Sequence, residues 1–394
     1  MHTLINRTLT SSIIEKLKAN PVVAILGPRQ CGKSTLANII APTQKNMIFL
    51  DLERPSDLNR LNEPELFFSH NKEALIVLDE IQRVPNLFPI IRSTVDTNHR
   101  HGQFLILGSA SEKLIRQSSE SLAGRIAYIE LTPFLFNEAT RVPFLKDPLN
   151  TLWLRGGFPR SLLAKTDHES FEWRLNFIRT FLEQDISNLG IKIPAEHLSR
   201  FWRMFAHLNG QLLNSAKLAG SLGISSHTVR HYIDILRHTF MLRVLEPYST
   251  NNKKRLVKSP KVFLRDSGLL NALLDIESAN DLFAHPTFGS SWEGFVIEQI
   301  LSLSPRFKAC FYRNSNGNEI DLILQYKQKR VAIECKSSLT PQIRPGLMVA
   351  LDELSIDQAW IIAPVEPGSS YPLSKRVTVS SLAKCIEFLN QSFL

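Results

Sequence analysis

Four short runs of consecutive apolar residues recur within the first 135 positions of the chain. They are VVAIL (22–26), MIFLDL (47–52), ALIVLD (74–79) and FLILGS (104–109), and helix-length segments separate them. Runs without polar alternation are typical of strands buried on both faces, as in a parallel sheet covered by helices. The pattern therefore predicts an α/β fold for this part of the chain.

The pattern changes after this part. Apolar residues at helical spacing in 171–189 and 201–208 predict a helical region, and residues 208–265 have the punctuation of a helix-turn-helix followed by a wing. From residue 287 onward the order is helix, three strands, helix and strand. We therefore expect a multi-domain α/β protein with four parts: an α/β domain at 1–140, a helical region at 141–207, a winged helix at 208–265 and a second α/β domain at 266–394.

The composition, with 43% hydrophobic and 21% charged residues, is ordinary for folded soluble protein. No apolar run approaches the roughly 18 residues needed to span a bilayer, and the N-terminus lacks the apolar core of a secretory signal. The four cysteines are scattered, which argues against a disulfide framework or a zinc site and suits a reducing cytosol: Cys31, Cys310, Cys335 and Cys385. We expect a cytoplasmic protein without a membrane partner.

Positive charge exceeds negative charge along the chain. The formal net charge is +9. Such an excess attracts polyanions at long range and gains free energy from released counterions, so it favours nucleic acid as a partner.

A phosphate-binding motif follows the first apolar run. Residues 27–35, GPRQCGKST, fit G-x-x-x-x-G-K-[ST], and the LANII that follows continues as a helix. In this context backbone N–H groups and a helix N-terminus surround the phosphates of a nucleotide, here ATP with Mg²⁺. Lys33 would contact the β- and γ-phosphates, Ser34 would bind Mg²⁺, and Thr35 would lie beside the α-phosphate. The expected nucleotide contacts are Gly27, Pro28, Arg29, Gln30, Cys31, Gly32, Lys33, Ser34 and Thr35.

The third apolar run ends in two carboxylates, Asp79 and Glu80. This pattern is typical of a Walker B element, in which Asp79 would hold the Mg²⁺ shell and Glu80 would orient and deprotonate the attacking water. The alternative is a polar cap on a strand end.

The order of these strands resembles the AAA+ ATPases, whose next strand carries a polar sensor near the γ-phosphate. This resemblance indicates Ser109 or Ser111, although either could instead cap the following helix. Arg125 is a candidate arginine finger or sensor arginine, with a surface arginine as the alternative. A finger that acts in trans would require a homo-oligomer.

Residues 214–236 predict two helices joined by a turn at Gly223, with Ser225 or Ser226 capping the second helix. Its exposed N-terminal half, where a recognition helix meets base edges, would carry His227, Thr228, Arg230 and His231. The wing that follows is rich in cations that could grip DNA phosphates: Lys253, Lys254, Arg255, Lys258, Lys261 and Arg265. The alternatives are a protein-binding winged helix and a solvated charged face.

A carboxylate cluster is predicted near the C-terminus. Asp321 begins one strand, while Glu334 and Lys336 lie on one face of the next, so that a hairpin would bring them together. Two carboxylates beside a lysine suit Mg²⁺ or Mn²⁺. The arrangement resembles the D…(E)xK nucleases of the restriction-endonuclease superfamily, and this resemblance makes Glu293 a helix-borne accessory carboxylate. The alternative is a salt-bridged relic without activity.

The whole order of motifs resembles a family of prokaryotic AAA+-like ATPases. The motifs include GPRQCGKSTL, LIVLDEIQ, LRGGFP, VFLRDSGLL and NEIDLIL…AIECK. That family joins a P-loop domain to a C-terminal winged helix and a restriction-endonuclease-like domain, which implies ATP binding and hydrolysis at the residues named above.

Two functions remain open from the sequence. One is an ATPase coupled to DNA binding, with metal-dependent DNA cleavage by the C-terminal domain. The other is a nucleotide-operated switch that binds protein or DNA, with an inactive nuclease-like domain. A kinase is disfavoured because Asp79 and Glu80 suit water better than a small acceptor.

Overall fold

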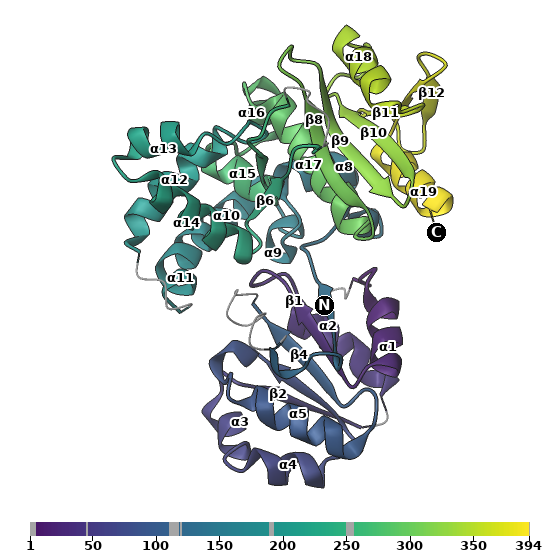
Figure 1. The fold of residues 1–394 in the computed structure, drawn as a ribbon. Helices are drawn as coiled ribbons and strands as arrows, with labels where there is room; N and C mark the ends of the chain where they lie inside the picture. The colour runs from purple at the N-terminus through teal and green to yellow at the C-terminus, as the bar shows by residue number, and fades with distance from the viewer. Residues whose placement is uncertain are drawn as a thin grey trace. The chain divides into compact units, whose positions relative to one another are not determined.

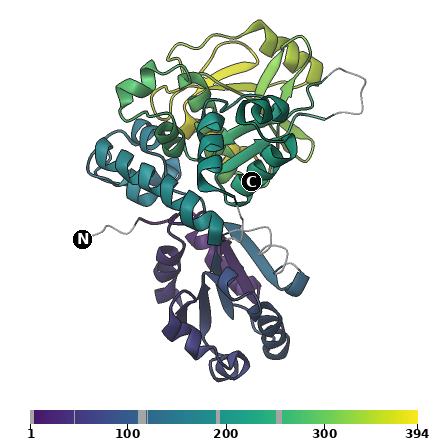
Figure 2. The ribbon, with the colours of Figure 1, turned by 90° about the vertical axis from the view of Figure 1, so that its left-hand side faces the viewer.

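The computed structural model describes residues 5–44, 46–109, 118, 120–188, 193–249 and 256–393. It divides into two compact units (Figures 1 and 2). Unit 1 consists of Met1–Phe134 and His238–Phe240, and unit 2 consists of Leu135–Arg237 and Met241–Leu394.

Unit 1 contains a five-stranded parallel sheet in the order β2-β3-β4-β1-β5. The four predicted apolar strands are confirmed, but β5 was not predicted. It lies at the edge of the sheet beside β1 and keeps only one of its five residues buried, so it lacks a continuous apolar run. The strands are β1 (Val22–Leu26), β2 (Met47–Asp51), β3 (Leu75–Asp79), β4 (Phe104–Gly108) and β5 (Ile126–Glu130).

Helices cover both faces of this sheet (Figure 1). Because side chains alternate along a strand, Val23 and Ile25 of β1 pack with α1 and α2, whereas Val22 and Ala24 pack with α4 and α5 on the other face. The helices are α1 (Thr10–Ala19), α2 (Lys33–Ile40), α3 (Pro55–Arg60), α4 (Pro64–His70) and α5 (Leu87–Asn98), with short 3₁₀ turns at Ala41–Thr43 and Ile81–Arg83.

The parallel arrangement decides where the polar loop residues lie. Strands β3, β4 and β1 are consecutive neighbours and run in one direction, so their carboxyl ends share one edge of the sheet. Gly27 follows β1, Asp79 ends β3 and Ser109 follows β4. These three positions therefore meet at one sheet edge, the usual place for a ligand in an open α/β sheet.

The first part of unit 2 is helical, as predicted for residues 141–207. Its elements, in chain order, are α7 (Phe136–Ala139), α8 (Pro148–Arg155), α9 (Pro159–Leu162), α10 (Asp167–Thr180), a π-helical turn (Phe181–Asp185), α11 (Ile186–Asn188) and α12 (Ala195–Ala206).

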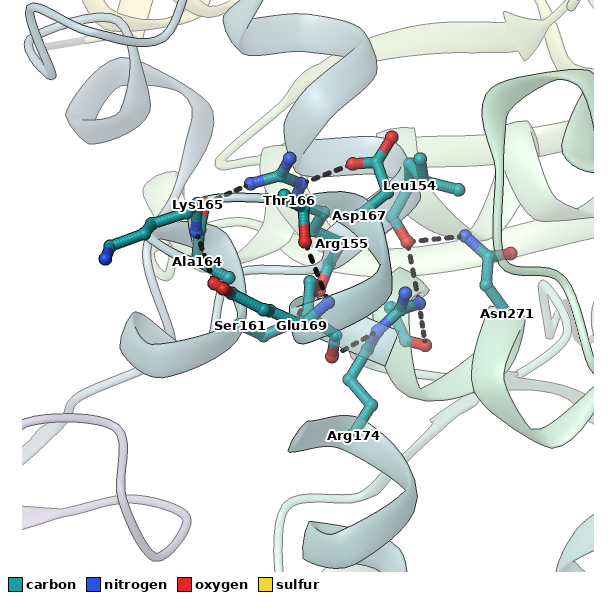
Figure 3. Close-up of polar contacts among 12 residues, drawn as sticks. Leu154, Arg155, Ser161, Ala164, Lys165, Thr166, Asp167, Glu169, Arg174 and Asn271 are labelled. Atoms are coloured by element: carbon teal, nitrogen blue, oxygen red, sulfur yellow. Dashed lines mark hydrogen bonds and ion pairs between the residues drawn. The ribbon is translucent and has the colours of Figure 1, made fainter. Parts of the chain in front are cut away.

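A buried arginine ties these helices to the later segment VFLRDSGLL. Arg174 of α10 is fully buried and donates hydrogen bonds to the carbonyl oxygens of Leu154 (3.0 Å) and Gly268 (2.9 Å). Figure 3 shows Arg174 and Asn271 pointing at the same Leu154 carbonyl. The carboxylate of Asp266 accepts from the backbone N–H groups of Gly157 and Leu269. Hydrogen bonds therefore join the motif LRGGFP (154–159) to the motif RDSG (265–268), partly through Arg174.

Residues 208–265 form two helices and a two-stranded sheet. Helix α13 (Ser215–Leu222) ends at Gly223, and the Ser225 hydroxyl accepts from the Thr228 N–H to cap α14 (Ser226–His238). Val229, Ile233 and Leu236 of α14 are buried. Strand β6 (Leu242–Leu245) pairs antiparallel with β7 (Lys261–Leu264). Of the predicted wing cations, Lys253, Lys254 and Arg255 lie outside the described residues.

The last part of unit 2 is a six-stranded mixed sheet in the order β12-β13-β11-β10-β9-β8. Helix α18 packs on one face, and α17 and α19 contact strands β10 and β11 (Figure 1). The elements are α15 (Ser267–Leu273), α16 (Ala279–Ala284), α17 (Phe288–Leu303), β8 (Lys308–Arg313), β9 (Glu319–Tyr326), β10 (Lys329–Cys335), α18 (Pro345–Leu354), β11 (Ala359–Ile362), β12 (Ser370–Pro372), β13 (Val377–Ser380) and α19 (Leu382–Phe393).

The predicted helical region, helix-turn-helix and C-terminal domain all fall almost entirely within unit 2. Within the described residues, no helix has the length and apolar character needed to cross a membrane.

A buried ion cluster joins β6, β7 and α17. Glu298 of α17 accepts hydrogen bonds from the guanidinium groups of Arg243 (3.0 Å) and Arg265 (2.7 Å). Burial alone would raise the pKa of Glu298, but the two arginines outweigh it and lower the pKa to about 2. Arg265 was predicted to grip DNA in a wing; it is instead engaged in this internal cluster.

We expect Glu298→Gln to destabilise unit 2 by about 3–5 kcal/mol at pH 7, because it leaves two buried guanidinium groups without their counter-charge. Since the folded pKa of Glu298 lies below its usual 4.5, its stabilisation is complete above that value and is lost as the pH falls toward 2. The difference between wild type and variant should shrink over the same interval.

Urea unfolding followed by tryptophan fluorescence measures this effect, because all five tryptophans lie in unit 2. The control is Glu196→Gln, which removes an exposed ion pair with Arg200 and should leave the midpoint unchanged. Equal midpoints for Glu298→Gln and the control would contradict the prediction.

Candidate functional site

The P-loop in unit 1 has a backbone that two of its residues make possible. Gly27 lies close to Leu131, the residue that follows β5. A Cβ on Gly27 would lie only 2.1 Å from the carbonyl oxygen of Leu131. Gly32 begins α2 with φ of 100°, and Gln30 also has positive φ, 63°. Because side-chain-bearing residues rarely adopt φ near 100°, Gly32 suits the turn that leads into the helix. The loop therefore presents backbone N–H groups at a helix N-terminus.

Lys33 folds over this loop. Its side chain is buried, and its ammonium donates to the carbonyl oxygens of Gly27 (3.1 Å) and Pro28 (2.9 Å). These bonds hold a cation within the turn of the loop, beside the backbone that would surround a phosphate. The arrangement can supply positive charge to an anion without moving the backbone.

Ser34 connects the P-loop with the acidic strand end. Its hydroxyl donates to the Asp79 carboxylate at 2.5 Å, although 45 positions separate the two residues in the chain. Burial raises the pKa of Asp79, while Ser34 and Lys33 act in the opposite direction. A hydroxyl and a carboxylate at one point are the hard oxygen ligands that Mg²⁺ prefers. The donor set therefore fits the ion predicted from sequence.

Glu80 follows Asp79 in an unusual backbone conformation. Its φ of 56° lies in the left-handed region, which side-chain-bearing residues rarely adopt. This conformation starts the 3₁₀ turn Ile81–Arg83. The carboxylate accepts from the Gln82 amide, and burial raises the pKa of Glu80. The half-buried carboxylate is thereby held in one orientation at the strand end.

Arg7 belongs to the site, although sequence reasoning missed it. It is buried, and its guanidinium donates to the carbonyl oxygens of Cys31 (3.0 Å) and Thr132 (2.7 Å) while it stacks on Phe134. Arg7 thus fastens the P-loop to the segment after β5. It precedes the first helix and belongs to no motif, so the sequence carried no signal for it.

The other P-loop positions differ in exposure. Thr35 is exposed, Arg29 is half-buried and Gln30 is exposed. Cys31 is buried, and its thiol donates to the Leu131 carbonyl at 3.5 Å, with its pKa raised by burial. The Cys31 side chain therefore packs into the core, so any nucleotide contact at this position comes from its backbone.

The predicted sensor and finger lie at opposite ends of the sheet. Ser109 follows β4 at the P-loop edge, whereas Ser111 lies outside the described residues. The carbonyl of Arg125 accepts from Val22 N–H at the start of β1. At roughly 3.3 Å per residue, the five residues of β1 separate Arg125 from the P-loop.

Arg125 is also engaged elsewhere, since its guanidinium pairs with Asp96 of α5 through two contacts of 2.5 and 3.0 Å. The prediction of a sensor or finger that acts on the nucleotide of its own chain is therefore wrong. The reason is the parallel sheet: Arg125 precedes β5, so it lies at the amino-terminal ends of the strands, whereas the P-loop lies at their carboxyl ends.

A second polar site lies in unit 2, where the predicted hairpin does bring the carboxylates together. Strands β9 and β10 pair antiparallel with Leu322 opposite Ile333, which places Asp321 beside Glu334. Asp321 accepts from the Cys335 N–H at 2.9 Å, and Lys336 contacts the Glu334 carboxylate. We call this site the carboxylate cleft. It has a volume of about 670 Å³, and its charged lining residues are Lys261, Glu293, Arg313, Glu319, Asp321, Glu334 and Arg344.

Lys261 provides the unexpected charge in this cleft. It was predicted to grip DNA phosphates from an exposed wing, and this prediction is wrong because its side chain is buried among carboxylates. Its ammonium lies 2.7 Å from Glu293, 2.5 Å from Glu319 and 3.5 Å from Asp321. Sequence reasoning missed Lys261 and Glu319 as members of the cleft, because a linear run of cations does not reveal which of them turns inward.

The carboxylate cleft does not fit the predicted second metal. Among the described residues, no three His, Cys, Asp or Glu side chains are grouped so as to hold a metal ion. Asp321, Glu334 and Glu293, the residues predicted as Mg²⁺ or Mn²⁺ ligands, have lysine partners instead. The three carboxylates are brought together, but a cation of the chain already lies among them.

The predicted recognition face of α14 is open to solvent. His227, Arg230 and His231 are exposed and Thr228 is partly exposed. The only described wing cation that remains exposed is Lys258. The cationic surface of residues 208–265 that the structure describes is therefore smaller than the sequence predicted.

In comparisons with known proteins, three family models match successive parts of the chain. A family model described as an AAA domain matches residues 19–140, and two described as domains of unknown function, DUF8612 and DUF4143, match 146–280 and 288–384. Among solved structures, the Walker-type ATPase of Pyrococcus abyssi is 13% identical with a TM-score of 0.48, and the similarity covers 68% of this chain and 96% of that one.

Uncharacterised proteins of Mycobacterium bovis and Mycobacterium tuberculosis are each 38% identical over 371 residues, which is 94% of this chain and 82% of theirs. An uncharacterised protein of Haemophilus influenzae is 24% identical over 290 residues, which is 66% of this chain and 70% of its own. At the identity and coverage of the mycobacterial relatives, the chain belongs to their family, and its residues 19–140 match the AAA domain.

Proposed function

We propose that the chain is a Mg²⁺-dependent ATPase that works as a nucleotide-operated switch and binds DNA through unit 2. The observation that carries the ATPase part is the hydrogen bond between Ser34 and Asp79. It brings the P-loop and the acidic strand end to one point, where a triphosphate and its metal need them.

The metal part rests on the donor set at this point. Ser34 and Asp79 would hold Mg²⁺, and the ion would neutralise charge on the phosphate oxygens. The hydroxyl of Ser34 already points at the Asp79 carboxylate. Lys33 would exchange its two carbonyl partners for phosphate oxygens, because a charged acceptor makes the stronger hydrogen bond.

Glu80 is the base that we propose for water activation. Its carboxylate lies next to Asp79 but bonds to Gln82 rather than to the P-loop, so it remains available to a water molecule. Burial raises its pKa, which makes the carboxylate a better proton acceptor than one in bulk water. Ser109, at the same sheet edge, is the polar sensor in this proposal.

The DNA part rests on helix α14. Its exposed face carries Arg230 and Arg237 with two histidines and one acid, Asp234, while its opposite face is buried in unit 2. A helix fixed on one side and cationic on the other suits contact with a duplex groove and its phosphates. The net charge of +9 favours the same class of partner. A protein partner at this face is the alternative that the DNA test below decides.

Glu80→Gln should lower the rate of ATP hydrolysis by at least about 10²-fold and leave ATP binding intact, because it removes the base but none of the proposed phosphate contacts. Lys33→Ala should weaken binding by about tenfold or more, since it removes a charged partner of the phosphates. Phosphate release measures turnover, and calorimetry with Mg²⁺ and ATP measures binding. Turnover by Glu80→Gln at the wild-type rate would exclude Glu80 as the base.

Arg125→Ala should leave ATP turnover within about twofold of wild type, because Arg125 lies at the sheet edge opposite the P-loop and pairs with Asp96. A finger that acts in trans predicts a different result. In that case turnover falls strongly in Arg125→Ala, and mixing this variant with Glu80→Gln restores part of it, because each chain supplies what the other lacks. Restoration on mixing would establish a homo-oligomer.

Arg230→Ala should weaken binding to a short duplex and reduce the slope of log affinity against log salt by about one, if Arg230 neutralises one phosphate. The control is Arg200→Ala, an exposed arginine on α12 paired with Glu196. Fluorescence anisotropy with labelled duplex measures both variants between low and physiological salt. Wild-type protein that shows no salt-dependent DNA binding would defeat the DNA part and favour a protein partner. ATP turnover with and without duplex then reports whether the two units are coupled.

A further inference from the structure

We propose that the ammonium of Lys261 takes the place of a divalent cation in the carboxylate cleft, so that this cleft is built to work without metal. The resemblance to metal-dependent nucleases predicted Mg²⁺ or Mn²⁺ at Asp321, Glu334 and Glu293, and the geometry of the cleft disagrees with that prediction.

The ammonium of Lys261 is fully used by the cleft. An ammonium group has three N–H donors. Three carboxylates surround this one, with Glu293 and Glu319 in close contact and Asp321 at 3.5 Å. The ammonium therefore lies between Glu293 of α17 and the carboxylates of strand β9. A metal ion that bridged these carboxylates would have to occupy the same position.

Other cations complete the charge balance of the cleft. Arg313 lies 3.3 Å from Glu319, and Lys336 contacts Glu334. Each of the four carboxylates therefore has a lysine or arginine partner. A divalent ion would have to displace these partners and would be repelled by any that stayed, and this repulsion is strong where burial weakens screening by water.

The cations of the cleft compete with a metal for its carboxylate oxygens. Among the described residues of the cleft, the buried carboxylate oxygen without a hydrogen-bond partner is Oε2 of Glu334. Mg²⁺ takes six ligands in octahedral geometry and Ca²⁺ takes six to eight. To gather such a set, the ion would have to take carboxylate oxygens away from the lysine and arginine partners named above.

The backbone holds Lys261 in this position. Residues on both sides are tied to the segment 210–213, through Gly210 N–H to the Val262 carbonyl (2.8 Å) and Leu213 N–H to the Pro260 carbonyl (2.8 Å). Strand β6 pairs with β7 on its other edge. The ammonium also lies 5.6 Å from the centre of the Phe311 ring. Because β7 is fixed along both edges, the lysine is part of the framework and not a mobile surface cation.

Lys261→Met should convert the cleft into a metal site, because methionine keeps much of the buried volume and removes the positive charge. The full chain is used with Ser34→Ala and Asp79→Asn in every sample, so that the proposed P-loop metal site is silent. Mn²⁺ binding is measured by electron paramagnetic resonance of the free ion. The chain with Lys261 should show no binding that depends on Glu334. Lys261→Met should gain one site at least about tenfold tighter, and Glu334→Gln in that background should abolish it.

The matched control is Lys258→Met, which removes an exposed lysine three positions away and should gain no site. Mn²⁺ binding that depends on Glu334 in the chain with Lys261 would overturn the proposal, and so would a folded Lys261→Met variant that gains no site. If Lys261→Met does not fold, Lys261→Arg provides the second variant: it keeps the charge and should still exclude Mn²⁺, and binding there would overturn the proposal. None of these readouts depends on ATP turnover, so the proposed ATPase function stands or fails separately.

Discussion

The meeting of Ser34 and Asp79 is the contact on which the candidate ATPase site depends, and it is a consequence of strand direction. Strands β1 and β3 are parallel and have only β4 between them, so the loop after one and the carboxylate at the end of the other share an edge. An antiparallel pairing would place them at opposite ends of the sheet. The same rule explains why Arg125 lies away from the phosphates, since it precedes its strand instead of following it.

Unit 2 depends on charges that are buried in opposite pairs. Glu298 lies between two arginines, and Lys261 lies among three carboxylates. Both clusters join the β6–β7 pair to helix α17, so the predicted wing is tied to the C-terminal sheet domain by ion pairs as well as by packing. Leaving any one of these charges unpaired lowers the stability of the fold, because the low dielectric constant of the interior strengthens a buried ion pair but penalises a lone ion.

The sequence predicted the elements better than it predicted the neighbours of individual charged residues. Apolar runs identified four of the five strands of unit 1, and β5 escaped because an edge strand needs fewer buried residues. The P-loop motif and the acidic pair were local signals and could be predicted. The role of Arg7 could not be predicted, because its guanidinium donates to carbonyl groups that lie up to 126 positions away in the chain. Lys261 was misinterpreted for a related reason: its direction is set by pairing along both edges of β7, which a charge count does not contain.

Comparison of the two lysines shows why a lysine beside carboxylates does not by itself indicate a metal site. Lys33 bonds to neutral carbonyl oxygens, which it can exchange for a phosphate, and the carboxylate next to it is bound to a hydroxyl that can share a metal ion. Lys261 bonds to the carboxylates themselves, and these bonds consume both the ligands and the negative charge that a metal would require. The partner of the ammonium group, and not its distance from the acids along the chain, separates a site that can accept a metal from one that has replaced it.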